Sequence, residues 1–486
     1  MSALSDSPVT SSPTDLYVGG EWQAAAGGRR LPIEDPATGE TLTEVADAAP
    51  EDALAALDAA CEAQADWART TPRERGEILR RAYEAVMADL EDLALLITLE
   101  MGKPLNEARA EVNYAADFFH WFAGEATRID GRWSMAEKGG SRVLVSKGPV
   151  GPCLFITPWN FPLAMGTRKI GPAIASGCAM VVKPAGQTPL AMLRLAKILE
   201  EAGLPAGVLN VVTSSRSGAV MAPIIEDSRL RKLSFTGSTE VGRQLVERSA
   251  KQLLRVSMEL GGNAPFLVFD DADIDEAVAG AMVAKMRNIG EACTAANRFL
   301  VHEAVAQEFA TKFSERMSVL RLGHGSLPET EVGPIIDGTQ RERLDELVRD
   351  AVAVGASVAT GGRAVDGPGY FYEPTVLTDV PDAARMLHEE VFGPVAPIRT
   401  FADEDEAIAV ANDTEYGLIA YAYTRDLQRG LRVMERLETG MVGLNQGVVS
   451  SASAPFGGVK HSGFGREGGR EGIEDYLVTK YTAIKM

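Results

Sequence analysis

The sequence predicts an α/β protein with two α/β domains and a small β extension. From residue 151 to residue 269, short β-branched runs alternate with helical stretches, and a second series of this kind begins near Asp271. The last segment, residues 476–484, alternates in the manner of an exposed strand. Such alternation is typical of βα units around a mostly parallel sheet, and the final strand favours pairing with another chain.

Composition limits the possible partners. The chain has 486 residues, of which 45% are hydrophobic and 24% charged, which is typical of a globular protein of roughly two to four domains. Its longest apolar runs fall far short of the ~20 residues that span a bilayer, so no membrane segment is expected. The net charge of -20 would repel phosphate backbones, so nucleic acid is not an expected partner. An anionic ligand would have to be met by local basic residues.

The N-terminus and the cysteines indicate a cytoplasmic protein without a metal site. Residues 1–14 are rich in Ser, Pro and Asp and lack the features of a secretory signal, so we predict a disordered tail. The cysteines are too scattered for a disulfide framework or a metal cluster. They are Cys61, Cys153, Cys178 and Cys293.

In chain order, the first elements are helical. A helix is predicted from Pro50, where Leu54, Leu57, Cys61 and Ala65 recur at helical spacing, and more helix follows through Ile97. Residues 141–146 read as a strand, and the stretch before them as a connection.

Two βα series follow. The first has a helix at residues 190–202 and strands at 154–156, 180–182, 209–212, 233–235 and 266–269. The second opens with a helix near Asp271 and has strands at 299–301, 397–400, 418–423 and 441–444.

A strand-to-helix turn and a carboxylate are the first candidate site features. In Phe235-Thr-Gly-Ser-Thr-Glu-Val-Gly242, Gly237 allows a tight turn, and the free N–H groups that open the next helix can face a phosphate. Neither G-x-G-x-x-G nor the P-loop pattern is present, so a plain turn stays open. Glu259 lies at the junction of the two series, where it can be a general base or a surface residue.

Cys293 is the candidate nucleophile. It follows a glycine turn, Gly290-Glu-Ala-Cys, and its thiol needs a helix N-terminus or a nearby cation to ionise at neutral pH. Cys153 and Cys178 lie in apolar runs and Cys61 on a helix face, so these three are expected to be core residues. Chemistry alone leaves a reactive and an inert Cys293 equally open.

Six segments, in this order, resemble the aldehyde dehydrogenase superfamily, and the resemblance extends from about Leu16 to Met486. The segments are Thr157-Pro-Trp-Asn-Phe-Pro162, Lys183-Pro-Ala, Phe235-Thr-Gly-Ser, Glu259-Leu-Gly-Gly, Cys293 and Glu390-Val-Phe-Gly-Pro394. Within the superfamily, residues 156–189, 231–242, 256–273 and 457–481 look like the NADP-dependent succinate-semialdehyde dehydrogenases.

The resemblance implies a domain organisation. A Rossmann-like NAD(P)-binding domain would comprise residues 15–132 and 151–262, and an α/β catalytic domain residues 263–445. Residues 133–150 and 446–486 would form an oligomerisation extension, so we expect a homo-oligomer, either a dimer or a tetramer.

The resemblance also implies a covalent mechanism. Cys293 would attack an aldehyde to give a thiohemiacetal, and the side-chain amide of Asn160 with the Cys293 N–H would form the oxyanion hole. After hydride transfer to the nicotinamide, Glu259 would deprotonate the water that hydrolyses the thioester.

For the cofactor, the resemblance implies a site that extends from the nicotinamide to the adenosine ribose. Its residues would be Thr157, Trp159, Asn160, Lys183, Pro184, Ala185, Gly186, Gly237, Ser238, Leu260, Glu390 and Phe392. Lys183 supplies a cation for a 2′-phosphate without an acid beside it, which favours NADP. Gly186 stands where close relatives have Ser, so one phosphate hydrogen bond is missing and NAD stays possible.

For the substrate, the relatives' carboxylate-binding positions fall on Arg168, Arg287 and Ser450, which implies oxidation of succinate semialdehyde to succinate. Glutarate semialdehyde or an aliphatic aldehyde is the alternative, because spacing alone also allows surface arginines. A thiol esterase or a non-oxidising scaffold of the same fold is the remote alternative.

Two positions depart from the family pattern. Glu291 replaces the usual Gln and would oppose thiolate formation if it pointed toward Cys293. Ala295 stands where some relatives have a second Cys, so no local disulfide switch is expected.

Overall fold

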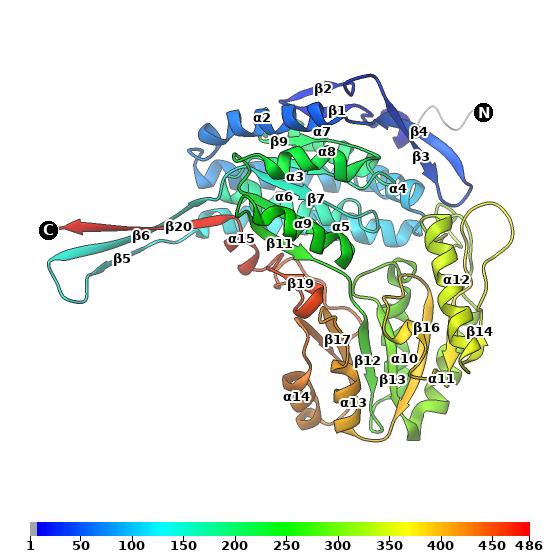
Figure 1. Ribbon diagram of the computed structural model, residues 1–486. Coiled ribbons are helices and arrows are strands. Elements are labelled where there is room, and N and C mark those ends of the chain that lie inside the picture. The colour runs from blue at the N-terminus through cyan, green and yellow to red at the C-terminus, as the bar shows by residue number, and fades with distance from the viewer. Residues whose placement is uncertain (1–6) are drawn as a thin grey trace.

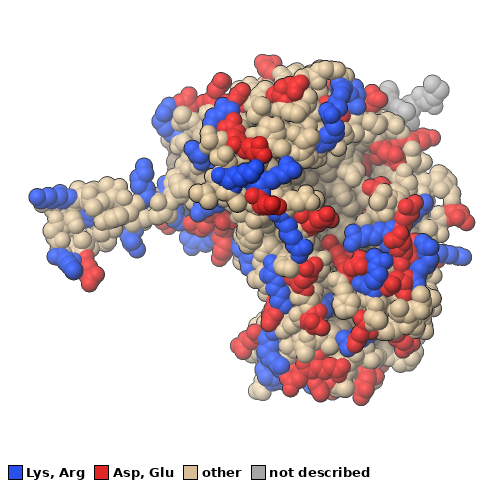
Figure 2. All heavy atoms as spheres, in the orientation of Figure 1, with Lys and Arg blue, Asp and Glu red and all other residues tan. Residues whose placement is uncertain are grey.

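The structure, a computed structural model, describes residues 7–486 and confirms the predicted α/β class. Two sheet-centred units lie side by side, and a thin β extension projects from the first (Figure 1). Figure 2 shows acidic and basic side chains interspersed over both units. Within residues 7–486, no helix combines the length and apolar character that a bilayer crossing requires.

An eight-stranded sheet forms the first unit, in the order β19-β11-β10-β7-β8-β9-β1-β2. The five central strands are parallel, and the sheet ends in antiparallel strands on both sides. The strands are β1 Leu16–Val18, β2 Glu21–Gln23, β7 Cys153–Ile156, β8 Met180–Lys183, β9 Leu209–Val211, β10 Lys232–Thr236, β11 Arg255–Glu259 and β19 Gly463–Phe464. Strand order reverses between β7 and β10, and ligands of open α/β sheets bind at the carboxyl ends of the strands beside such a reversal.

Helices cover this sheet on both faces (Figure 1). They are α2 Pro50–Trp67, α3 Pro72–Ala88, α4 Leu90–Met101, α5 Leu105–Glu125, α6 Ala164–Ser176, α7 Leu190–Glu201, α8 Ser217–Glu226 and α9 Thr239–Ala250. A hairpin of β3 Arg30–Asp35 and β4 Glu40–Ala46 lies at the rim. The helices predicted from Pro50, at residues 190–202 and after Ser238 are confirmed.

The second unit has a seven-stranded sheet in the order β14-β15-β16-β13-β12-β17-β18, parallel except for β14. Its strands are β12 Ala264–Val268, β13 Ala296–His302, β14 Ser357–Thr360, β15 Thr375–Thr378, β16 Val395–Phe401, β17 Ile419–Tyr423 and β18 Met441–Leu444. Its helices are α10 Ile274–Met286, α11 Glu303–Ser318, α12 Gly338–Ala353, α13 Glu404–Asn412 and α14 Leu427–Arg436. All the strands predicted for this series are confirmed.

The extension is a three-stranded sheet of β5 Arg132–Met135, β6 Ser141–Pro149 and β20 Leu477–Lys485. The predicted C-terminal strand is therefore present, and it pairs with β6 of its own chain. Residues 132–135 were interpreted as part of a connection, but they pair with β6 instead. Between β18 and β20 the chain returns to the first unit through β19 and α15 Glu471–Glu474. The domain boundaries themselves stay a prediction.

The prediction of disorder is wrong for residues 7–14. Residues Pro8–Ser11 form the helix α1, with Pro8 in the first turn and the Ser7 hydroxyl accepting from the Val9 N–H. Val9 is buried in the core, and Arg194 donates to the hydroxyl groups of Ser11 and Ser12 at 3.1 and 3.4 Å. A composition rich in Ser and Pro is typical of disorder, but the same two residues in the order Ser-Pro also begin helices. Composition alone therefore did not reveal the helix α1. Residues 1–6 lie outside the described residues.

Candidate active site

A cavity of about 180 Å³ lies where the two units meet. It collects residues from both βα series, which the sequence separates widely. The predicted site residues in its lining are Trp159, Asn160, Gly237, Ser238, Glu259, Leu260, Cys293, Glu390 and Phe392. One residue of the lining, Trp159, packs edge-on against Phe392, with 5.4 Å between the ring centroids.

The loop that carries Cys293 is shaped by three consecutive left-handed residues. Asn288, Ile289 and Gly290 have φ values of 57°, 61° and 76°, which turn the chain from α10 toward β13. A Cβ atom on Gly290 would lie 2.2 Å from the Gly393 carbonyl oxygen, so only glycine fits there. Cys293 is half-buried and reaches the cavity.

The other three cysteines take no part in the cavity. Cys153 and Cys178 are fully buried in the hydrophobic core, as expected. Cys61 is half-buried and packs at the edge of a second core cluster. Cys293 is therefore the one cysteine in the lining of this cavity among the described residues.

Burial dominates the electrostatics of the Cys293 thiol and raises its pKa to about 12. The positive charges of Arg168 and Arg287 lower this pKa, while Glu390 and Glu259 raise it. The expected nearby cations are present, but they do not outweigh desolvation and two carboxylates. Thiolate formation therefore requires added positive charge or a proton acceptor at the cavity.

Glu259 ends β11 and is fully buried, with neither carboxyl oxygen bonded to another described residue. Burial raises the pKa of Glu259 well above its usual range, and the negative charge of Glu467 adds to the effect. Arg168 and Lys169 act in the opposite direction. A carboxyl group with a raised pKa and free oxygen atoms beside a thiol has the chemistry of a general base for water.

Sequence reasoning missed Glu467, which forms a buried cluster with two basic residues of α6. Its Oε2 lies 2.7 Å from Arg168 Nη2, and its Oε1 pairs with Lys169. These two cations outweigh burial and lower the pKa of Glu467. The stretch Gly465-Arg-Glu-Gly reads as a loop, so only the fold reveals that Glu467 packs against α6.

The ion pair with Glu467 makes Arg168 less available to bind a substrate carboxylate. Arg168 is fully buried, paired with Glu467, and stacked over the Phe456 ring at 3.9 Å. Part of its charge is already neutralised. It still acts on Cys293, whose pKa it lowers.

Arg287 and Ser450 lie together, as the resemblance implies. Arg287 Nη1 donates to Ser450 Oγ at 3.2 Å, and its guanidinium lies 5.2 Å from the ring centroid of Phe161. Arg287 and Arg168 both lower the pKa of the buried Tyr114 phenol, which burial raises. The two arginines therefore approach a common region beside Cys293.

Glu291 does not point toward the thiol. It is fully buried, and its Oε1 accepts from the Ile336 N–H at 3.2 Å. Burial raises the pKa of Glu291 well above its usual range, which favours the uncharged acid. An uncharged carboxylic acid is close in shape to the Gln that relatives carry.

We expect Glu291→Gln to stabilise the protein more at high pH than at low pH. Because the folded-state pKa is raised, the unfolded chain ionises Glu291 first, so this residue costs stability progressively as pH rises above about 4.3. Glutamine carries no such cost. Thermal melting should show a Tm gain of at least about 2 °C at pH 8 and a smaller one at pH 5. An equal shift at both pH values would contradict the raised pKa of the buried Glu291 carboxyl.

A second cavity, of about 670 Å³, continues from the first along the carboxyl ends of β7, β8 and β10. The two share Trp159, Gly237 and Ser238, so they form one groove. The other predicted cofactor residues in its lining are Thr157, Lys183, Ala185 and Gly186. Pro184 lies next to this lining in sequence without contributing to it. Ser238 caps α9, whose N-terminal N–H groups open at the groove.

Lys183 fits an anionic group in this groove. Its side chain is 4% exposed, and burial alone lowers its pKa to about 8. Glu34 and Glu100 also line the groove, but neither shifts the pKa of Lys183. A buried cation without an ion-pair partner among residues 7–486, beside a helix N-terminus, suits a phosphate of a dinucleotide.

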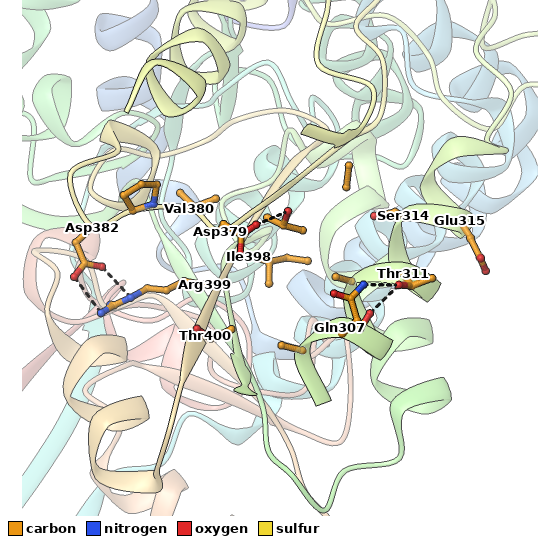
Figure 3. A pocket seen from close by; sticks show the side chains of 15 residues that line it. Gln307, Thr311, Ser314, Glu315, Asp379, Val380, Asp382, Ile398, Arg399 and Thr400 are labelled. Atoms are coloured by element: carbon orange, nitrogen blue, oxygen red, sulfur yellow. Dashed lines mark hydrogen bonds and ion pairs between the residues drawn. The ribbon is translucent and has the colours of Figure 1, made fainter. Parts of the chain in front are cut away.

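A third hollow, of about 730 Å³, lies away from this groove, between α11 and the strands β15 and β16 (Figure 3). Its polar side chains bind one another, since Gln307 donates to Thr311 at 3.2 Å and Arg399 pairs with Asp382 at 2.9 Å. None of the predicted site residues lines it. Within residues 7–486, no group of three or more His, Cys, Asp or Glu side chains is placed to hold a metal ion.

Comparison with known proteins agrees with this geometry. The model of the aldehyde dehydrogenase family matches residues 22–482, so the chain belongs to the aldehyde dehydrogenase family. It is 60% identical to a succinate-semialdehyde dehydrogenase of Paenarthrobacter nicotinovorans over 91% of this chain and 98% of that protein. It is 49% identical to a glutarate-semialdehyde dehydrogenase of Pseudomonas putida over 97% of both chains. A crystal structure of an E. coli NADP-dependent enzyme superposes with a TM-score of 0.96, 49% identity and 98% coverage of both chains.

Proposed function

We propose that this chain oxidises succinate semialdehyde to succinate with NADP⁺. The observation that carries the proposal is the pairing of Arg287 with Ser450 beside Cys293, with Arg168 as a second cation nearby. In a protein of net charge -20, cations next to the nucleophile favour a substrate that carries a carboxylate. The relative of 60% identity is a succinate-semialdehyde dehydrogenase, which supports the same substrate.

In the proposed mechanism, the Cys293 sulfur attacks the aldehyde carbon and the second N–H of the Asn160 amide stabilises the oxyanion. Asn160 Nδ2 uses one hydrogen on the Glu291 carbonyl at 2.9 Å, which leaves the other for this task. NADP⁺, when bound, supplies the hydride acceptor and a positive charge. Glu259 then takes a proton from the water that releases succinate from the thioester.

Lys183 would hold the 2′-phosphate end of the cofactor. We expect the KM for NADP⁺ to rise above about pH 8, because the Lys183 ammonium, with its pKa lowered to about 8, then loses its proton. The KM for NAD⁺ should change less, since NAD⁺ has no 2′-phosphate. Initial rates from pH 7 to pH 9.5 with each cofactor check this, and Lys183→Ala should make both profiles parallel. Parallel profiles in the unaltered enzyme would argue against the assignment.

The test of the substrate class is Arg287→Ala, with Arg399→Ala as a control that removes a positive charge at the distant hollow. Losing a charged partner costs about 2–5 kcal/mol, so kcat/KM for succinate semialdehyde should fall at least about 30-fold. The value for butanal should fall much less, only through the loss of the effect of Arg287 on the Cys293 pKa, which is the smallest of the effects on that thiol. An equal loss for both aldehydes, or none for either, would overturn the carboxylate site.

Glutarate semialdehyde is the second candidate substrate, because a relative of 49% identity is named for it. It carries the same carboxylate one methylene further away, and one methylene is worth about 1–3 kcal/mol in a fitted pocket. The ratio of kcat/KM for the two semialdehydes decides between them. An esterase or a scaffold is disfavoured because the groove joins Cys293 to the Lys183 segment.

We further propose that the protein is a cytoplasmic homo-oligomer assembled through the extension. Trp133, Met135 and Tyr481 on its strands are 57%, 61% and 63% exposed, which is unusual for large apolar side chains on a monomer. Sedimentation velocity distinguishes a dimer from a tetramer, and a monomer at micromolar concentration would contradict the assembly.

A further inference from the structure

Asn288 is a buried residue in an unusual backbone conformation, three residues before Glu291. It has φ 57° and ψ 37°, in the left-handed region that Asn tolerates better than most residues other than glycine. Its side chain is fully buried, and it lies in the turn between α10 and the Cys293 loop. The family motifs that carry the resemblance do not include it.

Both hydrogens of the Asn288 amide are used, and each bridges a different loop of the site. Nδ2 donates to the Asn160 carbonyl oxygen at 3.1 Å and to the Glu291 carbonyl oxygen at 2.8 Å. Asn160 completes the arrangement, because its own Nδ2 donates to the same Glu291 carbonyl at 2.9 Å. One amide group therefore ties the loop after β7 to the loop before Cys293.

Two further contacts hold this arrangement in place. Lys103 Nζ donates to the Asn160 carbonyl oxygen at 2.8 Å, and the Asn288 N–H donates to the Glu107 carboxylate. The Asn160 backbone is thus fixed from two directions, and Asn288 is fixed at its own backbone. The Asn288 amide therefore links a fixed Asn160 backbone to the Glu291 carbonyl, two residues before Cys293.

We propose that Asn288 is a positioning residue. It holds the Asn160 amide at the place beside Cys293 where the oxyanion forms. The inference rests on the role proposed above for Asn160. An oxyanion donor is effective only within a few tenths of an ångström of its place, so a small displacement of Asn160 slows the reaction although Asn288 touches no reacting atom. Two carbonyl acceptors also explain why a donor amide, and not a carboxylate, stands at this position.

A double-mutant cycle separates positioning from general support of the fold. Asn288→Gly removes the amide and keeps the left-handed backbone accessible. In the otherwise unaltered enzyme, we expect it to lower kcat about 10- to 100-fold, measured with whichever aldehyde the enzyme turns over fastest. In the Asn160→Ala background, itself slowed about 100- to 1000-fold, the same substitution should cost less than about 3-fold.

Controls keep the cycle interpretable. Asp379→Gly also places glycine at a left-handed position, φ 53°, at the distant hollow, and should leave kcat unchanged. NADP⁺ titration by quenching of tryptophan fluorescence should give the same dissociation constant for Asn288→Gly and Asp379→Gly as for the unaltered enzyme. If Asn288→Gly fails to fold, Asn288→Asp replaces it in the same cycle, since it keeps the shape and loses both donors.

Each outcome decides the matter. A loss at least about three times larger with Asn160 present than without it supports positioning, and a smaller ratio overturns it. If Asn160→Ala is slow but Asn288→Gly costs the same with and without Asn160, this inference alone is overturned. An Asn160→Ala enzyme of normal rate overturns the proposed role of Asn160, and the inference with it.

Discussion

Replacing Cys293 with Ala is expected to lower the rate of aldehyde oxidation by at least about 10⁴-fold, because no covalent intermediate can form without the thiol. NADP⁺ should bind the variant unchanged, since the groove around Lys183 and Ser238 does not depend on the sulfur. Cys61→Ala, at the edge of a core cluster away from the cavity, is the matched control and should retain full rate. Steady-state rates and a cofactor titration check both. A Cys293→Ala enzyme within 100-fold of normal would exclude the covalent mechanism.

Glu259→Gln is expected to slow turnover about 10²- to 10⁴-fold while leaving the first half of the reaction intact. Mixing this variant with aldehyde and NADP⁺ should therefore produce a burst of one reduced cofactor per site, followed by slow release. Without a burst, Glu259 would not be assigned to thioester hydrolysis.

The same residue predicts the pH dependence. Because burial raises the pKa of Glu259 well above its usual range, the carboxyl reaches its proton-accepting form at a higher pH than an ordinary glutamate. Turnover by the unaltered enzyme should climb with pH through the neutral and mildly alkaline range. In Glu259→Gln this rise should be lost.

The strand series and the catalytic motifs were predictable from the sequence because both are local. Runs such as residues 154–156 and 418–423 are apolar and buried, so periodicity reveals them. The strand β11 was missed because Arg255 and Glu259 frame it with charge, although its centre is buried. The short helix at Pro8 was missed because tail composition outweighed its capping pattern.

The contacts that tune the site were not predictable, because each joins segments far apart in the chain. Arg168 was expected to be a substrate ligand, yet only the fold brings Glu467 within 2.7 Å of it. Spacing likewise says nothing about where Glu291 points, and the structure directs it to the Ile336 N–H. Asn160 and Asn288 meet only because the loop after β7 and the Cys293 loop come together at the cavity between the two units.

These contacts also explain why the thiol has so high a pKa before the reactants bind. Burial opposes the thiolate, and the negative charges of Glu390 and Glu259 oppose it further. Both carboxyl groups have raised pKa values, to about 7 for Glu390. Protonation of either carboxylate would remove its negative charge and so lower the pKa of Cys293.

The most direct test of the central claim is the initial rate of reduced-cofactor formation at 340 nm by the purified protein. Succinate semialdehyde and butanal, each with NADP⁺ and with NAD⁺, make up the four reactions. The account predicts the highest kcat/KM for succinate semialdehyde with NADP⁺, at least about 30 times that for butanal, since the charged partner contributes about 2 kcal/mol or more. Equal or faster turnover of butanal with either cofactor would contradict it.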